Sequence, residues 1–263
     1  MEHEEIDPDD TMFNHSFAKG LKVLFAFKGS NGSMSLSEVA KQLQMSISST
    51  QRFLYTLEKL GLVAKSPGTK KYRLTLGVLE LGYNYIASDP LVEAANPFLA
   101  ELSNITGETT NLTKPIGLDM IYVSRVVAAK FIPIHMPTGS RIPMYCTGSG
   151  RAYLSALPDD EVQRMLKAST LTRHTQWTET DPDRIFNLIA QSRRNGYAYN
   201  KEELFLGDMT LAAPIIGGNG TPVACVHIVA PTSRWTLEEA QARLAPPLLA
   251  CARGVMNAAR SIT

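Results

Sequence analysis

Ser35-Leu-Ser-Glu-Val-Ala40 and Ser46-Ile-Ser-Ser-Thr-Gln-Arg-Phe-Leu-Tyr-Thr-Leu-Glu-Lys-Leu-Gly61 are the two stretches that decide the fold of the N-terminal part of this 263-residue chain. Ser35 is followed three residues later by Glu38, a capping box that predicts a helix start. Ser46 is a suitable N-cap for the next helix, and Gly61 is expected to end it. The apolar stripe expected on that helix consists of Ile47, Leu54, Leu57 and Leu60.

The flanking sequence completes a winged helix-turn-helix over residues 16–75. Apolar residues spaced three or four apart predict an earlier helix, and they are Phe17, Leu21, Leu24 and Phe27. Leu62–Lys65 and Lys71–Leu74, on either side of a turn, predict a two-stranded hairpin. Residues 1–15 are acidic and have no apolar period, so we expect a disordered tail there.

Charge is unevenly divided along the chain, although its formal net value is only +1. Residues 18–74 hold ten Lys or Arg against Glu38 and Glu58, a net charge of +8. Such a basic segment is typical of a module that meets phosphates, although lysines that only solubilise a helical face give the same count. The acidic start is unlike a signal peptide and no apolar run is long enough to span a membrane, so we expect a cytoplasmic protein with no membrane partner.

The outward side of the Ser46–Leu60 helix carries residue types that can read DNA. Arg can bind guanine and Gln can bind adenine bidentately, while hydroxyls and hairpin cations can reach the backbone. Each residue alone could equally be solvated surface, so the hypothesis depends on the agreement of fold, charge and chemistry. The partner expected is operator double-stranded DNA, and the predicted contact residues are Ser35, Ser46, Ser48, Ser49, Gln51, Arg52, Tyr55, Lys70, Lys71 and Arg73.

The rest of the chain predicts a linker helix over residues 76–90 and an α+β domain over residues 91–263. Helices are expected at Pro90–Ile105, Ser149–Ala156, Asp159–Lys167, Asp181–Asn195 and Leu237–Arg260. Strands are expected at Thr109–Pro115, Asp119–Val127, Phe131–Met136, Gly196–Asn200, Met209–Ile216 and Pro222–Ala230. The segment Gly217–Gly220 between the last two strands predicts a hairpin turn.

From Phe17 onward the sequence resembles the IclR family of bacterial regulators. The two stretches quoted first are similar to its reading head, and Tyr72–Gly77 with Leu79–Gly82 looks like its wing exit and linker helix. The segments that match its effector domain are Gly139–Pro143, Thr147–Ala152, Leu171–Thr175, Gly196–Ala198 with Glu202 and Glu203, and Ala212–Pro214. The resemblance implies a GAF-like effector-binding domain, dimers or dimers of dimers, and control of catabolic genes by a small metabolite, frequently a carboxylic acid. Ile47 stands where the family commonly has a basic residue, and the Ser-rich segment from Ser48 onward also departs from the family pattern, so the operator sequence cannot be transferred.

In the resembling proteins the effector lies between the sheet and a loop that corresponds to Gly139–Gly150. Backbone N–H groups of Thr147–Gly150 at a helix start favour a carboxylate, although an ordinary turn and N-cap explain the same sequence. Arg125 could instead form a structural ion pair, and a lone His227 in an apolar strand is more often a core residue. The predicted effector-binding residues are Asn111, Thr113, Tyr122, Arg125, Met144, Tyr145, Thr147, Gly148, Ser149, Tyr197, Asn200, Glu203, His227 and Val229. Their character favours a small acid, preferably aromatic, and no cofactor or metal is expected.

Two other functions are compatible with parts of the sequence. Cys146 and the histidines at 135, 174 and 227 could supply a nucleophile and a base for a cysteine-dependent hydrolase. However, the chain has no nucleophile elbow, Walker loop, dinucleotide fingerprint or paired-His metal spacing. A metabolite-sensing or scaffold module that acts through protein partners is the other alternative, and the basic segment argues against it. We therefore expect a transcriptional regulator and not an enzyme.

Overall fold

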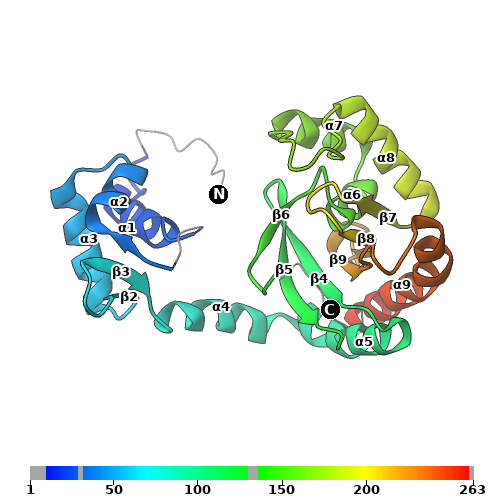
Figure 1. Ribbon diagram of the computed structural model, residues 1–263, viewed down its shortest axis with the longest axis horizontal. Helices are drawn as coiled ribbons and strands as arrows, with labels where there is room; N and C mark the ends of the chain where they lie inside the picture. Colours follow the sequence, from blue (N-terminus) through cyan, green and yellow to red (C-terminus); the bar gives the residue numbers. More distant parts are fainter. Residues whose placement is uncertain (1–9, 29–31, 130–135, 261–263) are drawn as a thin grey trace. The chain divides into compact units, whose positions relative to one another are not determined.

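A computed structural model describes residues 10–28, 32–129 and 136–260. The chain divides into two compact units, residues 1–86 and 87–263, whose elements are labelled in Figure 1. Within the described ranges, none of the helices combines the length and the apolarity needed to cross a bilayer. Residues 1–9 of the expected tail lie outside the described residues, and the first helix begins at His15, where the Asn14 side chain accepts a hydrogen bond from the Phe17 N–H.

The first unit is a winged helix-turn-helix, as the sequence predicts. Its elements are α1 (His15–Phe25), β1 (Met34–Ser35), α2 (Leu36–Gln42), α3 (Ile47–Lys59), β2 (Val63–Lys65) and β3 (Lys71–Leu74). The strands form an antiparallel sheet in the order β1-β3-β2. The capping box at Ser35 and Glu38 is present, and Ser46 caps α3. Strand β1 is absent from the sequence prediction because two residues carry no detectable alternation.

The buried faces of the first and third helices differ from the predicted stripes. Ile47 is 49% exposed and Leu60 is 66% exposed, so both predictions of core positions are wrong. The buried face of α3 is Thr50, Leu54 and Leu57. Thr50 can occupy this face because its hydroxyl donates to the Ser46 carbonyl oxygen at 3.0 Å, so no polar group is left unpaired. In α1, Phe17 and Leu21 are exposed, and Val23 is buried instead.

The second unit is built on one antiparallel sheet of six strands in the order β6-β5-β4-β9-β8-β7. The strands are β4 (Thr110–Ile116), β5 (Asp119–Val126), β6 (Arg141–Pro143), β7 (Ala198–Lys201), β8 (Met209–Ile216) and β9 (Pro222–Val229). The helices are α5 (Pro90–Thr106), α6 (Gly148–Ser155), α7 (Asp159–Ala168), α8 (Pro182–Asn195) and α9 (Leu237–Arg260). Before them, α4 (Gly77–Ser88) occupies the predicted linker.

Helices cover both faces of this sheet, which confirms the α+β class. Helices α5 and α9 pack on one face, whereas α6, with α7 and α8 beside it, lies over the other (Figure 1). The predicted hairpin between β8 and β9 is present, with Gly220 at a φ of 81°. The strand expected at Phe131–Met136 lies outside the described residues except for Met136. Strand β6 was not predicted, because three residues at a sheet edge show no clear period.

Candidate functional site

The outward face of α3 presents the side chains predicted to contact DNA. Ser48, Gln51, Arg52 and Tyr55 are exposed, and Ser49 is half-buried. Gln51, Arg52 and Tyr55 border one shallow groove along the helix surface. This face follows from the helix period, because burial of Leu54 and Leu57 turns the intervening positions outward.

The serines at the two helix starts already serve as caps. The Ser46 hydroxyl accepts a hydrogen bond from the Ser49 N–H at 3.2 Å, and the Ser35 hydroxyl accepts one from the Glu38 N–H at 3.2 Å. A hydroxyl that accepts in this way keeps its own proton, which can be donated to a phosphate. Capping and DNA contact are therefore compatible at both positions.

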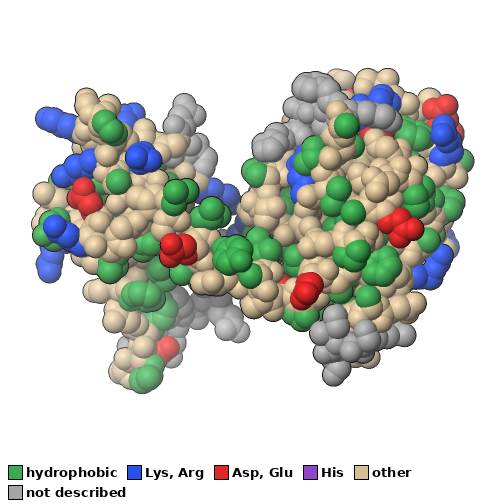
Figure 2. Space-filling view, turned by 90° about the horizontal axis from the view of Figure 1, so that it is seen from below, with side chains coloured by type: hydrophobic (Ala, Val, Ile, Leu, Met, Phe, Trp, Pro, Cys, Tyr) green, Lys and Arg blue, Asp and Glu red, His purple; other side chains and the backbone are tan. Residues whose placement is uncertain are grey.

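Exposed cations extend from α3 onto the β2–β3 hairpin. Lys70, Lys71 and Arg73 are all exposed, and Lys71 Nζ lies 3.8 Å from a carboxylate oxygen of Glu38. In Figure 2 several Lys and Arg side chains are visible on the surface of this unit, with few acidic side chains beside them. The first unit therefore combines an exposed helix face that can contact bases with a basic wing that can contact phosphates.

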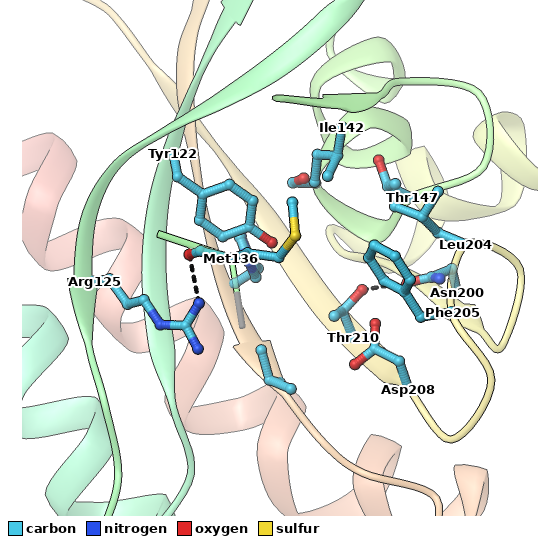
Figure 3. Close-up of a pocket in the computed structure, with 13 residues that line it drawn as sticks. Tyr122, Arg125, Met136, Ile142, Thr147, Asn200, Leu204, Phe205, Asp208 and Thr210 are labelled. Atoms are coloured by element: carbon cyan, nitrogen blue, oxygen red, sulfur yellow. Dashed lines mark hydrogen bonds between the residues drawn. The ribbon is translucent and has the colours of Figure 1, made fainter. Parts of the chain in front are cut away.

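A cavity opens in the second unit between the sheet, the start of α6 and the loop between β7 and β8 (Figure 3). The free volume of the cavity is about 30 Å³, which is room for about two water molecules, so the side chains that line it have to move apart to admit an organic ligand. Seven of the predicted effector-binding residues line it, and they are Tyr122, Arg125, Thr147, Ser149, Asn200, His227 and Val229. The other lining residues were not predicted from the sequence, and they are Met136, Ile142, Leu204, Phe205, Asp208 and Thr210.

The other seven predicted residues do not line this cavity. Asn111 and Thr113 are fully buried on β4, Met144 is buried below the α6 start, and Tyr197 interacts with Gln241 of α9. The Tyr145 hydroxyl donates to the Thr172 carbonyl oxygen at 2.5 Å. Gly148 and Glu203 have structural partners described below. Alternation along strands identifies a face of the sheet, but it does not show which positions of that face other elements cover.

The first turn of α6 is closely packed against its surroundings. A Cβ atom at Gly150 would lie 2.2 Å from Met144 Cα, so only glycine permits this approach. The Gly148 N–H donates to Asn200 Oδ1 at 3.2 Å, and the Gly150 N–H donates to the Thr147 hydroxyl at 3.2 Å. Two of the N–H groups expected to cradle a carboxylate are thus occupied within the protein, one by the N-cap Thr147 and the other by Asn200 of β7.

Several buried polar atoms of the cavity lack partners within the described part of the chain. They are Ser149 Oγ, both ring nitrogens of His227 and Arg125 Nε. Burial lowers the pKa of His227 to about 3, so the imidazole is neutral, and its ring stands edge-on to Tyr122 with centroids 5.3 Å apart. The Arg125 Nη1 group donates to the Met136 carbonyl oxygen at 2.5 Å. Unpaired buried donors and acceptors are rare in folded proteins, and a bound polar molecule is one way to satisfy them.

Glu203 belongs to a buried ion pair instead of the cavity wall. Arg151, which is only 2% exposed, donates two hydrogen bonds to the Glu203 carboxylate at 2.5 and 2.7 Å. The second carboxylate oxygen also accepts the Glu179 N–H at 3.1 Å. Because Arg151 and Glu203 lie far apart in the sequence, no local pattern indicates that they pair. The Glu202–Glu203 dipeptide therefore resembled a functional motif, although Glu203 has a structural role.

The thiol of Cys146 is buried, and burial raises its pKa to about 12. It therefore remains protonated at neutral pH, whereas nucleophilic cysteines are thiolates. Among the described residues, no group of three His, Cys, Asp or Glu side chains is placed to hold a metal ion.

The first unit is a winged helix-turn-helix with a basic wing, and the second is an α+β unit that contains a polar cavity. Together they define a DNA-binding regulator with a ligand-binding domain. The family description "IclR helix-turn-helix domain" matches residues 16–67, and "Bacterial transcriptional regulator IclR C-terminal" matches residues 83–257. The chain belongs to the IclR family of bacterial transcriptional regulators.

Individual relatives agree with this assignment. The Pca regulon regulatory protein of Pseudomonas putida is 33% identical over 95% of this chain and 85% of its own length. The crystal structure of a transcriptional regulator from Rhodococcus sp. RHA1 is 35% identical, with a TM-score of 0.83, and the match covers 95% of this chain and 100% of that one. An IclR homologue from Microbacterium hydrocarbonoxydans, complexed with 4-hydroxybenzoate, shares the fold at 20% identity, with a TM-score of 0.78 and coverage of 94% and 99%.

Proposed function

We propose that this regulator binds operator DNA through α3 and the β2–β3 wing, and that a small organic acid in the cavity of the second unit controls catabolic genes by changing that binding. The observation that carries the proposal is the set of unpartnered buried polar atoms around the cavity, together with the cation Arg125. A ligand can regulate only if it binds two arrangements of the protein with different affinity.

Arg125 indicates that the ligand is an acid. Its Nε is buried without a partner among the described residues, while Nη1 is held by the Met136 carbonyl. A carboxylate beside this guanidinium would accept a charge-assisted hydrogen bond. Apolar walls complete the cavity, and they include Tyr122, Ile142, Leu204 and Phe205. We propose an aromatic acid, and the 4-hydroxybenzoate complex of the homologue supports the capacity of this fold to enclose one.

Calorimetry with benzoate and its neutral isostere benzamide tests the acid. We expect benzoate to bind at least about ten-fold more tightly, since hydrogen bonds to charged groups contribute about 1.5–3 kcal/mol. Arg125→Leu should remove this preference, whereas a control variant, Arg164→Leu at an exposed position of α7, should retain it. Equal affinity of the wild type for benzoate and benzamide would contradict the proposal.

The DNA-binding residues are proposed from exposure and chemistry. Arg52 suits the O6 and N7 atoms of guanine, Gln51 suits adenine, and Lys70 suits the phosphate backbone. Their exposure on one unit supports the proposal. A regulator without catalysis also fits the protonated thiol of Cys146.

We propose that the protein works as a dimer or a dimer of dimers, with α4 in a contact between copies. No residue of α4 is buried, and Leu79, Leu81 and Tyr83 are exposed large apolar side chains on it. Water-exposed apolar side chains gathered on one helix are typical of an association surface. In sedimentation velocity, Leu79→Lys should weaken self-association, and Glu80→Lys on the same helix should change it less. Equal sedimentation of wild type and Leu79→Lys would contradict this role of α4.

A further inference from the structure

Asp208 lines the cavity, and among the described residues its side chain has no partner that would give it a structural role. Its carboxylate forms no hydrogen bond and no ion pair in the part of the chain that the structure describes. Burial raises the pKa of this carboxyl to about 7. Asp208 is partly buried, and a partly desolvated carboxyl without a partner costs stability, so its presence on the wall of the cavity that Arg125 also lines points to a ligand.

The loop that carries Asp208 is fixed by several hydrogen bonds. The Glu202 N–H donates to the Asp208 carbonyl oxygen at 2.6 Å, and the Gly207 N–H donates to the Glu202 carboxylate at 2.8 Å. The Thr232 N–H donates to the Gly207 carbonyl oxygen at 3.1 Å. Glu203, which follows Glu202, accepts hydrogen bonds from Arg151. Asp208 is therefore presented on a preorganised loop, as a specific contact requires.

Asp208 and Arg125 lie on opposite sides of the cavity. In Figure 3, Arg125 lies on one side of Tyr122 and Met136, and Asp208 lies on the other, next to Thr210. An acid whose carboxylate pairs with Arg125 therefore directs its far end toward Asp208. The Thr210 hydroxyl at that end already donates to Asn200 Oδ1. If the far end is apolar, it covers the Asp208 carboxyl without giving it a hydrogen-bond partner, which is unfavourable.

We propose that Asp208 accepts a hydrogen bond from a hydroxyl group of the effector and so selects hydroxylated acids over acids that lack the hydroxyl. This inference rests on the proposed function, because it takes the carboxylate to lie at Arg125. A site built to hydrogen-bond a hydroxyl rejects the analogue without it more strongly than an apolar pocket rejects an added group.

The test uses two pairs of acids that differ in one hydroxyl at the end far from the carboxylate, benzoate with 4-hydroxybenzoate and propionate with 3-hydroxypropionate. Calorimetry on the full chain compares the wild type with Asp208→Leu, Asp208→Asn and the control Asp160→Asn, which changes an exposed residue of α7. In the wild type and in Asp160→Asn, the hydroxylated member of at least one pair should bind at least about ten-fold more tightly. The preference should fall to within about two-fold in Asp208→Leu and be partly kept in Asp208→Asn, since an amide oxygen still accepts.

The outcomes separate this inference from the proposed function. If the acids bind without preference for the hydroxylated member, or if the preference survives Asp208→Leu, the role of Asp208 is overturned while acid sensing stands. If none of the four acids binds to the wild type, the proposed function itself fails, and the selection by Asp208 fails with it. Both tryptophans, Trp177 and Trp235, belong to the second unit, so tryptophan fluorescence during urea unfolding verifies that each variant of that unit is folded.

Discussion

Arg52 and Arg151 are the same residue type in opposite surroundings. Arg52 is exposed on α3, at the edge of a shallow groove that it shares with Gln51 and Tyr55. Arg151 is buried in the second unit, where its guanidinium pairs with both oxygens of Glu203. An exposed cation stays available to a phosphate or base, whereas a buried one is committed to its partner. Residue type alone therefore does not separate binding from structural roles, but surroundings do.

The largest expected effect comes from breaking the buried pair. Arg151→Leu leaves the Glu203 carboxylate buried without its cation and should destabilise the second unit by about 3–5 kcal/mol. Urea unfolding followed by tryptophan fluorescence measures this. The exposed pair supplies the contrast, because Glu38→Gln removes the charge that pairs with Lys71 but keeps an acceptor for the Ser35 N–H, so the first unit should lose little stability when its unfolding is followed by circular dichroism. Similar losses in the two variants would show that burial does not distinguish the pairs.

The next effect is a pH dependence that originates in the cavity. Because burial raises the pKa of Asp208 to about 7 from its ordinary 3.8, the folded protein holds this proton more tightly than the unfolded chain does. The second unit should therefore lose stability as the pH rises from about 4 to about 7, and Asp208→Asn should not share that loss. The variant's advantage is expected to reach about 4 kcal/mol near pH 8.

Urea unfolding across this pH range measures the difference between Asp208→Asn and the wild type. His227 acts in the opposite direction, since its lowered pKa makes stability fall as the pH drops below about 6.5. Tyr122 and Arg125 also line this cavity, and neither is altered in the comparison. A constant difference at all pH values would show that the Asp208 carboxyl does not titrate with a raised pKa.

On the exposed side of the comparison, Arg52→Ala should weaken operator binding by about 1–3 kcal/mol and relax the preference for one base. Lys70→Ala should weaken binding to all sequences alike and reduce its dependence on salt. Fluorescence anisotropy with operator and scrambled DNA at several salt concentrations measures both. If Arg52→Ala weakens binding to operator DNA and to scrambled DNA equally, Arg52 contacts only the DNA backbone.

The smallest effect concerns the corrected helix face. Ile47→Ala should change the stability of the first unit by no more than about 0.5 kcal/mol, because this side chain is exposed. Leu54→Ala, on the buried face of the same helix, should cost about 2–5 kcal/mol. Thermal unfolding followed by circular dichroism compares the two variants, and a large loss in Ile47→Ala would restore that residue to the core.

Much of the fold was predictable because its signals are local. The capping box at Ser35, the cap at Ser46 and the continuous apolar runs of β8 and β9 involve neighbours within a few residues, and those elements appear where expected. The outward face of α3 followed from the same local period. The prediction for Ile47 was wrong because periodicity identifies the apolar face of a helix but does not show how far along the helix the core covers that face.

The sequence by itself determined the helices, the longer strands, the fold class and the exposed basic face, since their signals come from neighbours along one helix or one hairpin. Only the tertiary structure decided which polar residues meet. It paired Arg151 with Glu203 and the Gly148 N–H with Asn200, each across 52 residues, and it brought Asp208 to the same cavity as Arg125. Burial and hydrogen-bond partners depend on how distant elements pack together, so Glu203 became a structural group and Asp208 a cavity residue.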